Sequence, residues 1–136
     1  MKNLIAMSAG LLIAGTAAFA QPVSSGRAEI LTSVPANSVT VTDWYKQNVY
    51  DPSNNKIGEI MDVLVSPEGR ATALIVGVGG FLGAGEKDVV VPFSAVKHAM
   101  KDKKIYLTMD TTKDALKSAP GFKYDREKMS WVPDTK

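Results

Sequence analysis

The chain has 136 residues, no cysteine, and 16 Lys and Arg against 14 Asp and Glu, for a formal net charge of +2. This near balance, with lysines scattered along the chain, excludes the electrostatic footprint of a nucleic-acid-binding protein. The lack of cysteine excludes disulfides and thiol chemistry, so a chain of this one-domain length depends on packing for its stability.

Residues 1–20 carry the pattern of a secretory signal peptide. Lys2 precedes a long apolar stretch, which ends in the small-residue cleavage pattern of residues 18–20. We expect cleavage between Ala20 and Gln21 and a periplasmic or secreted mature chain with no transmembrane span. The alternative, an uncleaved membrane anchor, is disfavoured because small polar residues make the stretch marginal for the roughly 20 apolar residues that a span needs.

Three regions follow in the expected mature chain. Residues 21–37 are rich in Ser, Ala, Pro and Gly without a sustained period, which is typical of a flexible leader. Residues 38–124 alternate between apolar runs and turn residues and form the expected domain, whereas residues 125–136 form a mostly polar tail. Trp131 stands out in this tail because an indole is costly to expose, so it either packs on the domain or awaits a partner.

The expected domain is a series of short apolar runs separated by turns. Alternating or β-branched runs predict about six strands, at residues 38–42, 47–50, 57–65, 71–78, 88–92 and 104–109. The alternation breaks between Gly58 and Met61, which predicts a bulge or burial on both faces. Helical spacing predicts one or two turns from Phe93 to Met100. It also predicts a short helix with Ala115, Leu116 and Ala119 on its apolar edge, which is stopped by Pro120 and Gly121.

These elements predict an all-β fold, a small antiparallel β-barrel of about six strands with one or two short helical segments. A barrel of this size is normally filled by its own side chains, which leaves little room for a ligand inside. The residues expected to fill it are Met61, Val63, Ile75, Val89, Ile105 and Leu107.

A glycine arch, residues 77–85, connects two of these predicted strands. Its glycines permit the sharp bend or close packing that such a connection requires, and they are Gly77, Gly79, Gly80, Gly83 and Gly85. Phosphate binding is disfavoured. A dinucleotide fingerprint would need glycine where Leu82 stands and a helix afterwards, and a P-loop would need Lys and then Ser or Thr directly after Gly85.

The glycine arch carries two apolar residues, Phe81 and Leu82, and is followed by Glu86 and Lys87. Exposed apolar side chains beside charges are typical of a protein interaction site, so these four residues are the candidate contact residues. In the alternative, Phe81 and Leu82 pack over the end of the barrel and serve only the fold. Both interpretations stay open at this point.

Little in the chain points to catalysis or to a metal. His98 is the only histidine and lies among lysines, so we expect a surface residue, and we expect no catalytic residues, metal site or cofactor. Asp51, Ser53 and Asn55 follow the ligand spacing of a calcium-binding EF-hand loop, but Lys56 stands where that loop needs glycine. A solvated turn is therefore the favoured interpretation.

Several motifs occur in the order found in one known family. They are Asn48-Val49-Tyr50, Lys56-Ile57-Gly58-Glu59-Ile60, Asp62-Val63-Leu64-Val65, Gly69-Arg70, Gly77 to Gly83, Glu86-Lys87, Val91-Pro92-Phe93 and Leu116 to Phe122. On these residues the chain resembles the PRC-barrel domain over Ser38 to Tyr124. The closing motif also resembles that of exported bacterial members.

The resemblance implies a barrel that acts as a docking and assembly module without catalysis, as in the photosynthetic reaction-centre H subunit and a ribosome-maturation factor. We therefore expect an exported non-catalytic module that binds another protein or associates with itself, for example as a homodimer. The alternative is a small-ligand carrier or sensor that uses the mouth of the barrel. Because one fold hosts many functions, this functional step is an analogy.

Overall fold

The computed structural model describes residue 10 and residues 27–79 and 86–135. The chain divides into two units, Met1–Ala36 and Asn37–Lys136, and the first contains no helix or strand among its described residues. Several expectations fall outside the described residues, namely the signal peptide with its cleavage site at Ala20 and Gln21, and the arch residues Gly80, Phe81, Leu82, Gly83 and Gly85.

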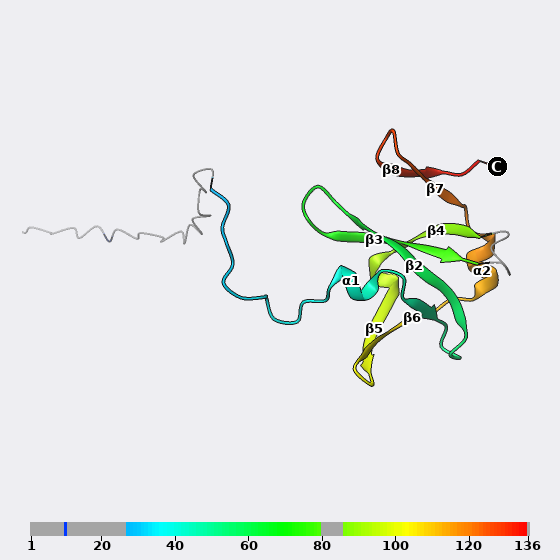
Figure 1. Cartoon of the computed structure of the whole chain (residues 1–136), viewed down its shortest axis with the longest axis horizontal. Coiled ribbons are helices and arrows are strands. Elements are labelled where there is room, and N and C mark those ends of the chain that lie inside the picture. Colours follow the sequence, from blue (N-terminus) through cyan, green and yellow to red (C-terminus); the bar gives the residue numbers. More distant parts are fainter. Residues whose placement is uncertain (1–9, 11–26, 80–85, 136) are drawn as a thin grey trace, which may run out of the picture. The chain divides into compact units, whose positions relative to one another are not determined.

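The second unit is built around one eight-stranded sheet (Figure 1). Its elements are α1 (Val41–Trp44), β1 (Asn48–Tyr50), β2 (Lys56–Val65), β3 (Ala71–Val78), β4 (Lys87–Pro92), the 3-10 helix η2 (Phe93–Ala95), β5 (Val96–Lys101), β6 (Lys104–Met109), α2 (Lys113–Ser118), β7 (Phe122–Asp125) and β8 (Ser130–Pro133). The strands follow the order β5-β6-β1-β2-β3-β4-β7-β8. Every neighbouring pair is antiparallel except β1 and β6, which are parallel.

The expected β-rich fold with short helices is confirmed, but the closed barrel of about six strands is not. Among the described residues the sheet has eight strands and runs from an open edge at β5 to an open edge at β8. The strands β5, β7 and β8 are additional to the predicted ones. β8 lies within residues 125–136, so the region expected to be a tail contributes to the sheet.

The remaining strands match their predicted positions, since β1, β2, β3, β4 and β6 each begin within one residue of the predicted start. The predicted irregularity in β2 is also present. The register between β2 and β3 runs from Ile60↔Val76 to Asp62↔Ile75, which leaves Met61 as an extra residue in a bulge. In a regular strand, residues three positions apart face opposite sides of the sheet. The extra residue changes this, so that Ile60 lies in the core and Val63 also packs against the core.

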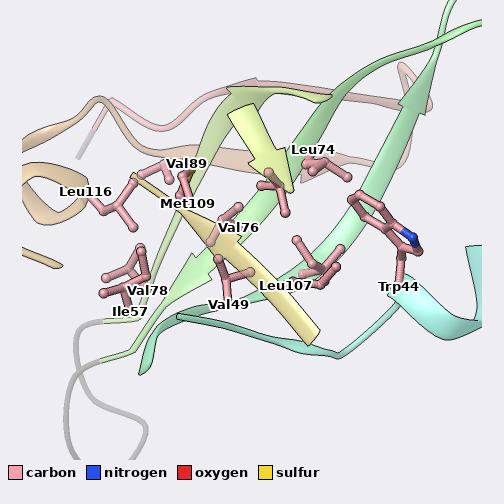
Figure 2. Packing of buried hydrophobic residues seen from close by; sticks show 12 residues of the cluster. Trp44, Val49, Ile57, Leu74, Val76, Val78, Val89, Leu107, Met109 and Leu116 are labelled. Atoms are coloured by element: carbon pink, nitrogen blue, oxygen red, sulfur yellow. The ribbon is translucent and has the colours of Figure 1, made fainter. Parts of the chain in front are cut away.

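The hydrophobic core collects side chains from the first six strands and from both α-helices. Its buried members are Trp44, Val49, Ile57, Ile60, Leu74, Val76, Val78, Val89, Val96, Leu107, Met109 and Leu116. Figure 2 shows the tryptophan of α1 at one end of this cluster and the leucine of α2 at the other. Of the residues predicted to fill the interior, Val89 and Leu107 lie in this core, while Val63 and Ile105 pack against it.

The opposite face of β3 is covered as well. Ile75 is fully buried, but its neighbours Leu74 and Val76 face the core, so the Ile75 side chain points to the other side of the sheet. There the C-terminal hairpin of β7 and β8 makes contact, because Trp131 Nε1 donates a hydrogen bond of 2.8 Å to Asp62 Oδ2, and Asp62 pairs with Ile75. Trp131 therefore docks on the domain.

Residues 38–42 do not form the predicted strand, and the chain enters α1 instead. The physical reason is the N-cap of Thr40. Thr40 Oγ1 accepts a hydrogen bond from the Asp43 backbone N–H at 3.1 Å and donates one to Asp43 Oδ2 at 2.7 Å. The short helix places Trp44 in the core, where its ring stacks on Phe93 with the ring centroids 4.8 Å apart.

The predicted helical turns from Phe93 to Met100 are wrong beyond the first three residues. Only Phe93–Ala95 is helical, and the chain then continues as β5, which pairs with β6 along its whole length. Asp102 and Lys103, with φ of 49° and 63°, form the two-residue turn that closes this hairpin. The hydrogen bonds and packing of the hairpin thus override the helical spacing of the apolar residues.

Trp131→Phe keeps an aromatic ring and removes the N–H group that donates to Asp62. We expect the free energy of unfolding to fall by about 1–2 kcal/mol, because a hydrogen bond to a carboxylate is lost at a half-buried position. Urea denaturation followed by circular dichroism measures this change. Tyr124→Phe is the matched control, since its ring lies 5.8 Å from that of Trp131 and only its hydroxyl is removed. Equal effects of the two substitutions would contradict a stabilising role for the bond.

Candidate functional site

A notch opens between the start of β2, the end of β3 and the start of α2, beside the described part of the glycine arch. We call it the arch notch. It has a volume of about 230 Å³ and is lined by Lys56, Ile57, Gly58, Glu59, Gly77, Gly79, Glu86 and Lys113. The structure thus brings three predicted site residues, Gly77, Gly79 and Glu86, to one place.

Gly77 is required here because other groups approach its backbone closely. A Cβ atom at this position would lie 2.9 Å from Met61 Cγ, 3.1 Å from Glu86 Oε1 and 3.3 Å from Asp88 Oδ1. Two carboxylates therefore converge over Gly77, in the space that a side chain would occupy. Gly79 differs, because a Cβ atom there would meet nothing within 4 Å among the described residues.

Asp88 is the residue of the arch notch region that sequence reasoning missed. It pairs with Gly77 across β3 and β4, and its Oδ1 atom is buried without a hydrogen-bond partner among the described residues. Burial raises the pKa of the Asp88 carboxyl, and the nearby charge of Glu86 raises it further. No local pattern signals this burial, because Asp88 stands only as the first residue of an apolar run.

The predicted contact residues Glu86 and Lys87 are neighbours with different surroundings. Glu86 is exposed on the wall of the arch notch. Lys87 is half-buried, and its Nζ donates hydrogen bonds to the carbonyl of Lys117 and, at 3.0 Å, to that of Ala119. These carbonyls end α2, so Lys87 holds the helix against β4 and its ammonium group is occupied within the fold.

The other candidate chemical groups lie in ordinary structural settings. His98 is exposed on β5, as expected, with its ring 5.8 Å from that of Trp44. Asp51 Oδ1 accepts backbone hydrogen bonds from Ser53 at 2.9 Å and Asn55 at 2.8 Å, and the bond from Asn55 is the main cause of a lowered pKa of the Asp51 carboxyl. The Asp51 carboxylate therefore stabilises its own turn, which agrees with the favoured interpretation of a solvated turn.

The arch notch combines two lysines, Lys56 and Lys113, with two glutamates, Glu59 and Glu86. Its volume lies below the roughly 300–1,000 Å³ that is typical of sites for organic ligands. In the part of the chain that the structure describes, no three or more His, Cys, Asp or Glu side chains are grouped to hold a metal ion. The arrangement suits contact with charged side chains of a partner better than enclosure of a ligand.

A second surface was also missed from the sequence. It is a groove of about 830 Å³ beside the start of β6, which we call the β6 groove. It is lined by Asp43, Gln47, Asn48, Tyr50, Met100, Lys101, Asp102, Lys103, Lys104, Ile105 and Tyr106. The lysines looked scattered in the sequence, and only the hairpin of β5 and β6 brings three of them together. The lone local signal was the outward alternation of charged and aromatic residues in β6.

Asp88→Asn tests the carboxylate beside Gly77, whose buried Oδ1 atom has no hydrogen-bond partner among the described residues. The pKa of Asp88 is raised in the folded chain above its ordinary value of 3.8, so its stabilising contribution is present at low pH and is lost as the pH rises through the folded-state pKa. We expect the substitution to raise the unfolding midpoint at neutral pH and to leave it nearly unchanged at about pH 3.5. Calorimetry across this range measures the difference.

Asp110→Asn is the control for this substitution, because Asp110 is an exposed carboxylate that follows β6. An Asp88→Asn chain that is less stable than the original at neutral pH would contradict the account, since it would mean that the ionised carboxylate is stabilising there.

Comparison of the chain with models of known protein families found a match. The family model of the PRC-barrel domain matches residues 36–116, which is more than half of the chain and includes every element from α1 to β6. The matched range ends before β7 and β8, so the C-terminal hairpin lies outside it. A comparison with curated proteins found no match to this chain. The resemblance inferred from the sequence is thus confirmed, and the chain belongs to the PRC-barrel domain family.

Proposed function

We propose that this chain is an exported, non-catalytic module that docks onto another protein or onto a second copy of itself. The observation that carries the proposal is its membership of the PRC-barrel family, a type of domain that is generally non-catalytic and mediates protein interactions. The packing of the molecule supports the same view. The core is filled by its own side chains, so the surfaces open to a partner lie on the outside of the sheet.

The open sheet offers such surfaces at both of its edges. Among the described residues, β5 and β8 each have a neighbouring strand on one side only, and edge strands are common sites of pairing with another chain. Exposed apolar side chains occur on or near the edges, with Met100 on β5 at 69% exposure and Met129 before β8 at 79%. Both edges are thus able to contribute to a docking surface.

The proposed export depends on residues 1–20, whose pattern is that of a signal peptide with cleavage after Ala20. Among the helices that the structure describes, none is long and apolar enough to cross a membrane. We propose a periplasmic or secreted mature chain that begins at Gln21.

The glycine arch is the proposed contact site, through Phe81 and Leu82 with Glu86 beside them. Glu86 is exposed on the arch notch and free to meet a charged partner group. Lys87 was grouped with these residues on the sequence, and we assign it a supporting role because its ammonium group binds the end of α2. A small-ligand carrier remains the alternative, with the arch notch as the opening.

The test begins with protein purified from the periplasm, whose intact mass should correspond to residues 21–136. Light scattering over a concentration series then measures self-association, and capture from periplasmic extract measures binding to another protein. We expect the double variant Phe81→Ala and Leu82→Ala to abolish this association. Its unfolding free energy should change by less than about 0.5 kcal/mol, as is usual for exposed contact residues.

The matched control is the double variant Val41→Ala and Val65→Ala, which removes two apolar side chains that are each 61% exposed and lie in neither proposed docking edge. It should leave association unchanged. A large loss of stability in the Phe81 and Leu82 variant would favour the alternative in which both residues only complete the fold. A strict monomer that captures no partner would contradict the docking function itself.

A further inference from the structure

The β6 groove lies beside a part of β6 that has no strand partner on one side. β6 pairs with β5 along its whole length, but on its other side β1 reaches only Leu107 and Thr108. In the described part of the chain, no strand pairs with Lys104–Tyr106 on the β1 side. The hairpin of β5 and β6 therefore projects from the sheet with an open inner edge (Figure 1).

The geometry of the hairpin directs backbone groups into the groove. Lys101 and Lys104 flank the two-residue turn and form its hydrogen-bonded pair, so the next pair, Met100 and Ile105, is a non-hydrogen-bonded one. The N–H and C=O of Ile105 consequently point away from β5. Leu107, two residues later, points the same way and meets β1. Ile105 thus offers a donor and an acceptor where β1 is too short to reach them.

The chain before β1 turns away and so leaves the space beside Ile105 open. Lys46 has φ of 65°, and its backbone N–H donates to the carbonyl of Ile60 at 2.8 Å. The carbonyl of Gln47 then accepts a bond of 2.9 Å from the Ile60 N–H. Through these two bonds, the residues before β1 pair with β2 and not with β6. The open space on the β1 side of Ile105, which we call the slot, therefore results from the hydrogen bonding of the fold itself.

The side chains around this slot are cationic and aromatic. Lys101, Lys103 and Lys104 are exposed and form no ion pair within the described residues. Lys101 Nζ lies 4.2 Å from the centre of the Tyr106 ring, which stacks on Tyr50 at a centroid distance of 4.9 Å. The two stacked tyrosine rings line the β6 groove beside the lysines.

The two carboxylates of the β6 groove offset only part of the charge of its three lysines, so the lining keeps a net charge of +1. The Asp43 carboxylate is held by Thr40 Oγ1 in the cap of α1. Asp102 lies in the turn between β5 and β6. An anionic partner group therefore gains more from the β6 groove than the two aspartates take away.

We propose that the β6 groove binds a short, extended, acidic segment of a partner protein, which adds as a strand to Lys104–Tyr106. The proposal rests on the docking function proposed above and names a second surface for it. An extended peptide suits the slot because it supplies a C=O for the Ile105 N–H and an N–H for the Ile105 C=O. A nucleic acid or lipid headgroup would meet the lysines but would leave this backbone pair unused.

The two faces of β6 predict the pattern of the bound segment. Lys104 and Tyr106 lie on one face of the strand, while Ile105 lies on the other, opposite the exposed Met100 of β5. A segment with acidic and apolar residues in alternation would place its acids beside the lysines and its apolar side chains beside Ile105 and Met100. The preferred partner is therefore an alternating acidic and β-branched sequence.

The test uses fluorescein-labelled peptides and fluorescence anisotropy with residues 21–136. The peptide Gly-Glu-Val-Glu-Val-Glu-Gly should bind, and the same peptide with Lys in place of Glu should not. Two further versions carry N-methyl groups either on the valines or on the glutamates. Because alternate N–H groups of a strand face the same neighbour, we expect only one of these two versions to lose binding. Equal binding of both would overturn strand addition without the need for any protein variant.

The protein variant is Lys101→Glu with Lys104→Glu, which should weaken acidic-peptide binding at least about tenfold. The control variant, Lys123→Glu with Lys128→Glu, makes the same change of charge at exposed positions on the C-terminal hairpin and should have less than about a twofold effect. Equal effects of the two variants would overturn the assignment to the β6 groove. Thermal midpoints check that both variants are folded.

Two outcomes separate this proposal from the docking function. If no peptide binds at about 1 mM while association through Phe81 and Leu82 persists, the β6 groove proposal is overturned and the docking function stands. If the protein binds phosphatidylglycerol vesicles and no peptide, the β6 groove is a lipid site and the proposal is likewise overturned.

Discussion

The arrangement of the sheet depends on the packing of the buried Trp44 side chain. Its indole is 2% exposed, stacks on Phe93 after β4, and lies 5.8 Å from the ring of His98 on β5. One side chain from α1 thus joins the connection out of β4 to the strand at the sheet edge, and it lies at one end of the core (Figure 2). Removing a buried aromatic side chain costs about 3–5 kcal/mol, a large share of the 5–15 kcal/mol or so that stabilises a domain.

Because side chains fill this core, the features open to a partner lie where strand pairing stops. At the β6 groove, β1 ends before it can cover Ile105. At the arch notch, β4 meets β7 through the single pair Asp88↔Phe122, and a carboxylate is held beside Gly77 without a hydrogen-bond partner among the described residues. Interrupted pairing leaves backbone and charged groups unused by the fold, and these are the groups that the proposed docking function would use.

The sequence predicted the parts of the structure that local patterns determine. β2, β3, β4 and β6 follow from apolar runs, and the break in alternation foretold the bulge at Met61. β5 could not be predicted in this way, because its pairing with β6 overrides a helical spacing. The N-cap residue Thr40 was present in the sequence, but the alternation of residues 38–42 was the clearer signal and predicted a strand. Asp88 and the β6 groove depend on strand register between distant residues, which one sequence does not reveal.

Residue-by-residue amide hydrogen exchange of the free mature chain tests the central claim most directly, because it reports where strand pairing ends. The account predicts that the Leu107 amide, covered by β1, exchanges slowly, whereas the Ile105 amide two residues earlier exchanges rapidly from the open β6 groove. Equally slow exchange at Ile105 and Leu107 would mean that the inner edge of β6 is already covered, and would contradict the view that this sheet keeps an edge open for a partner.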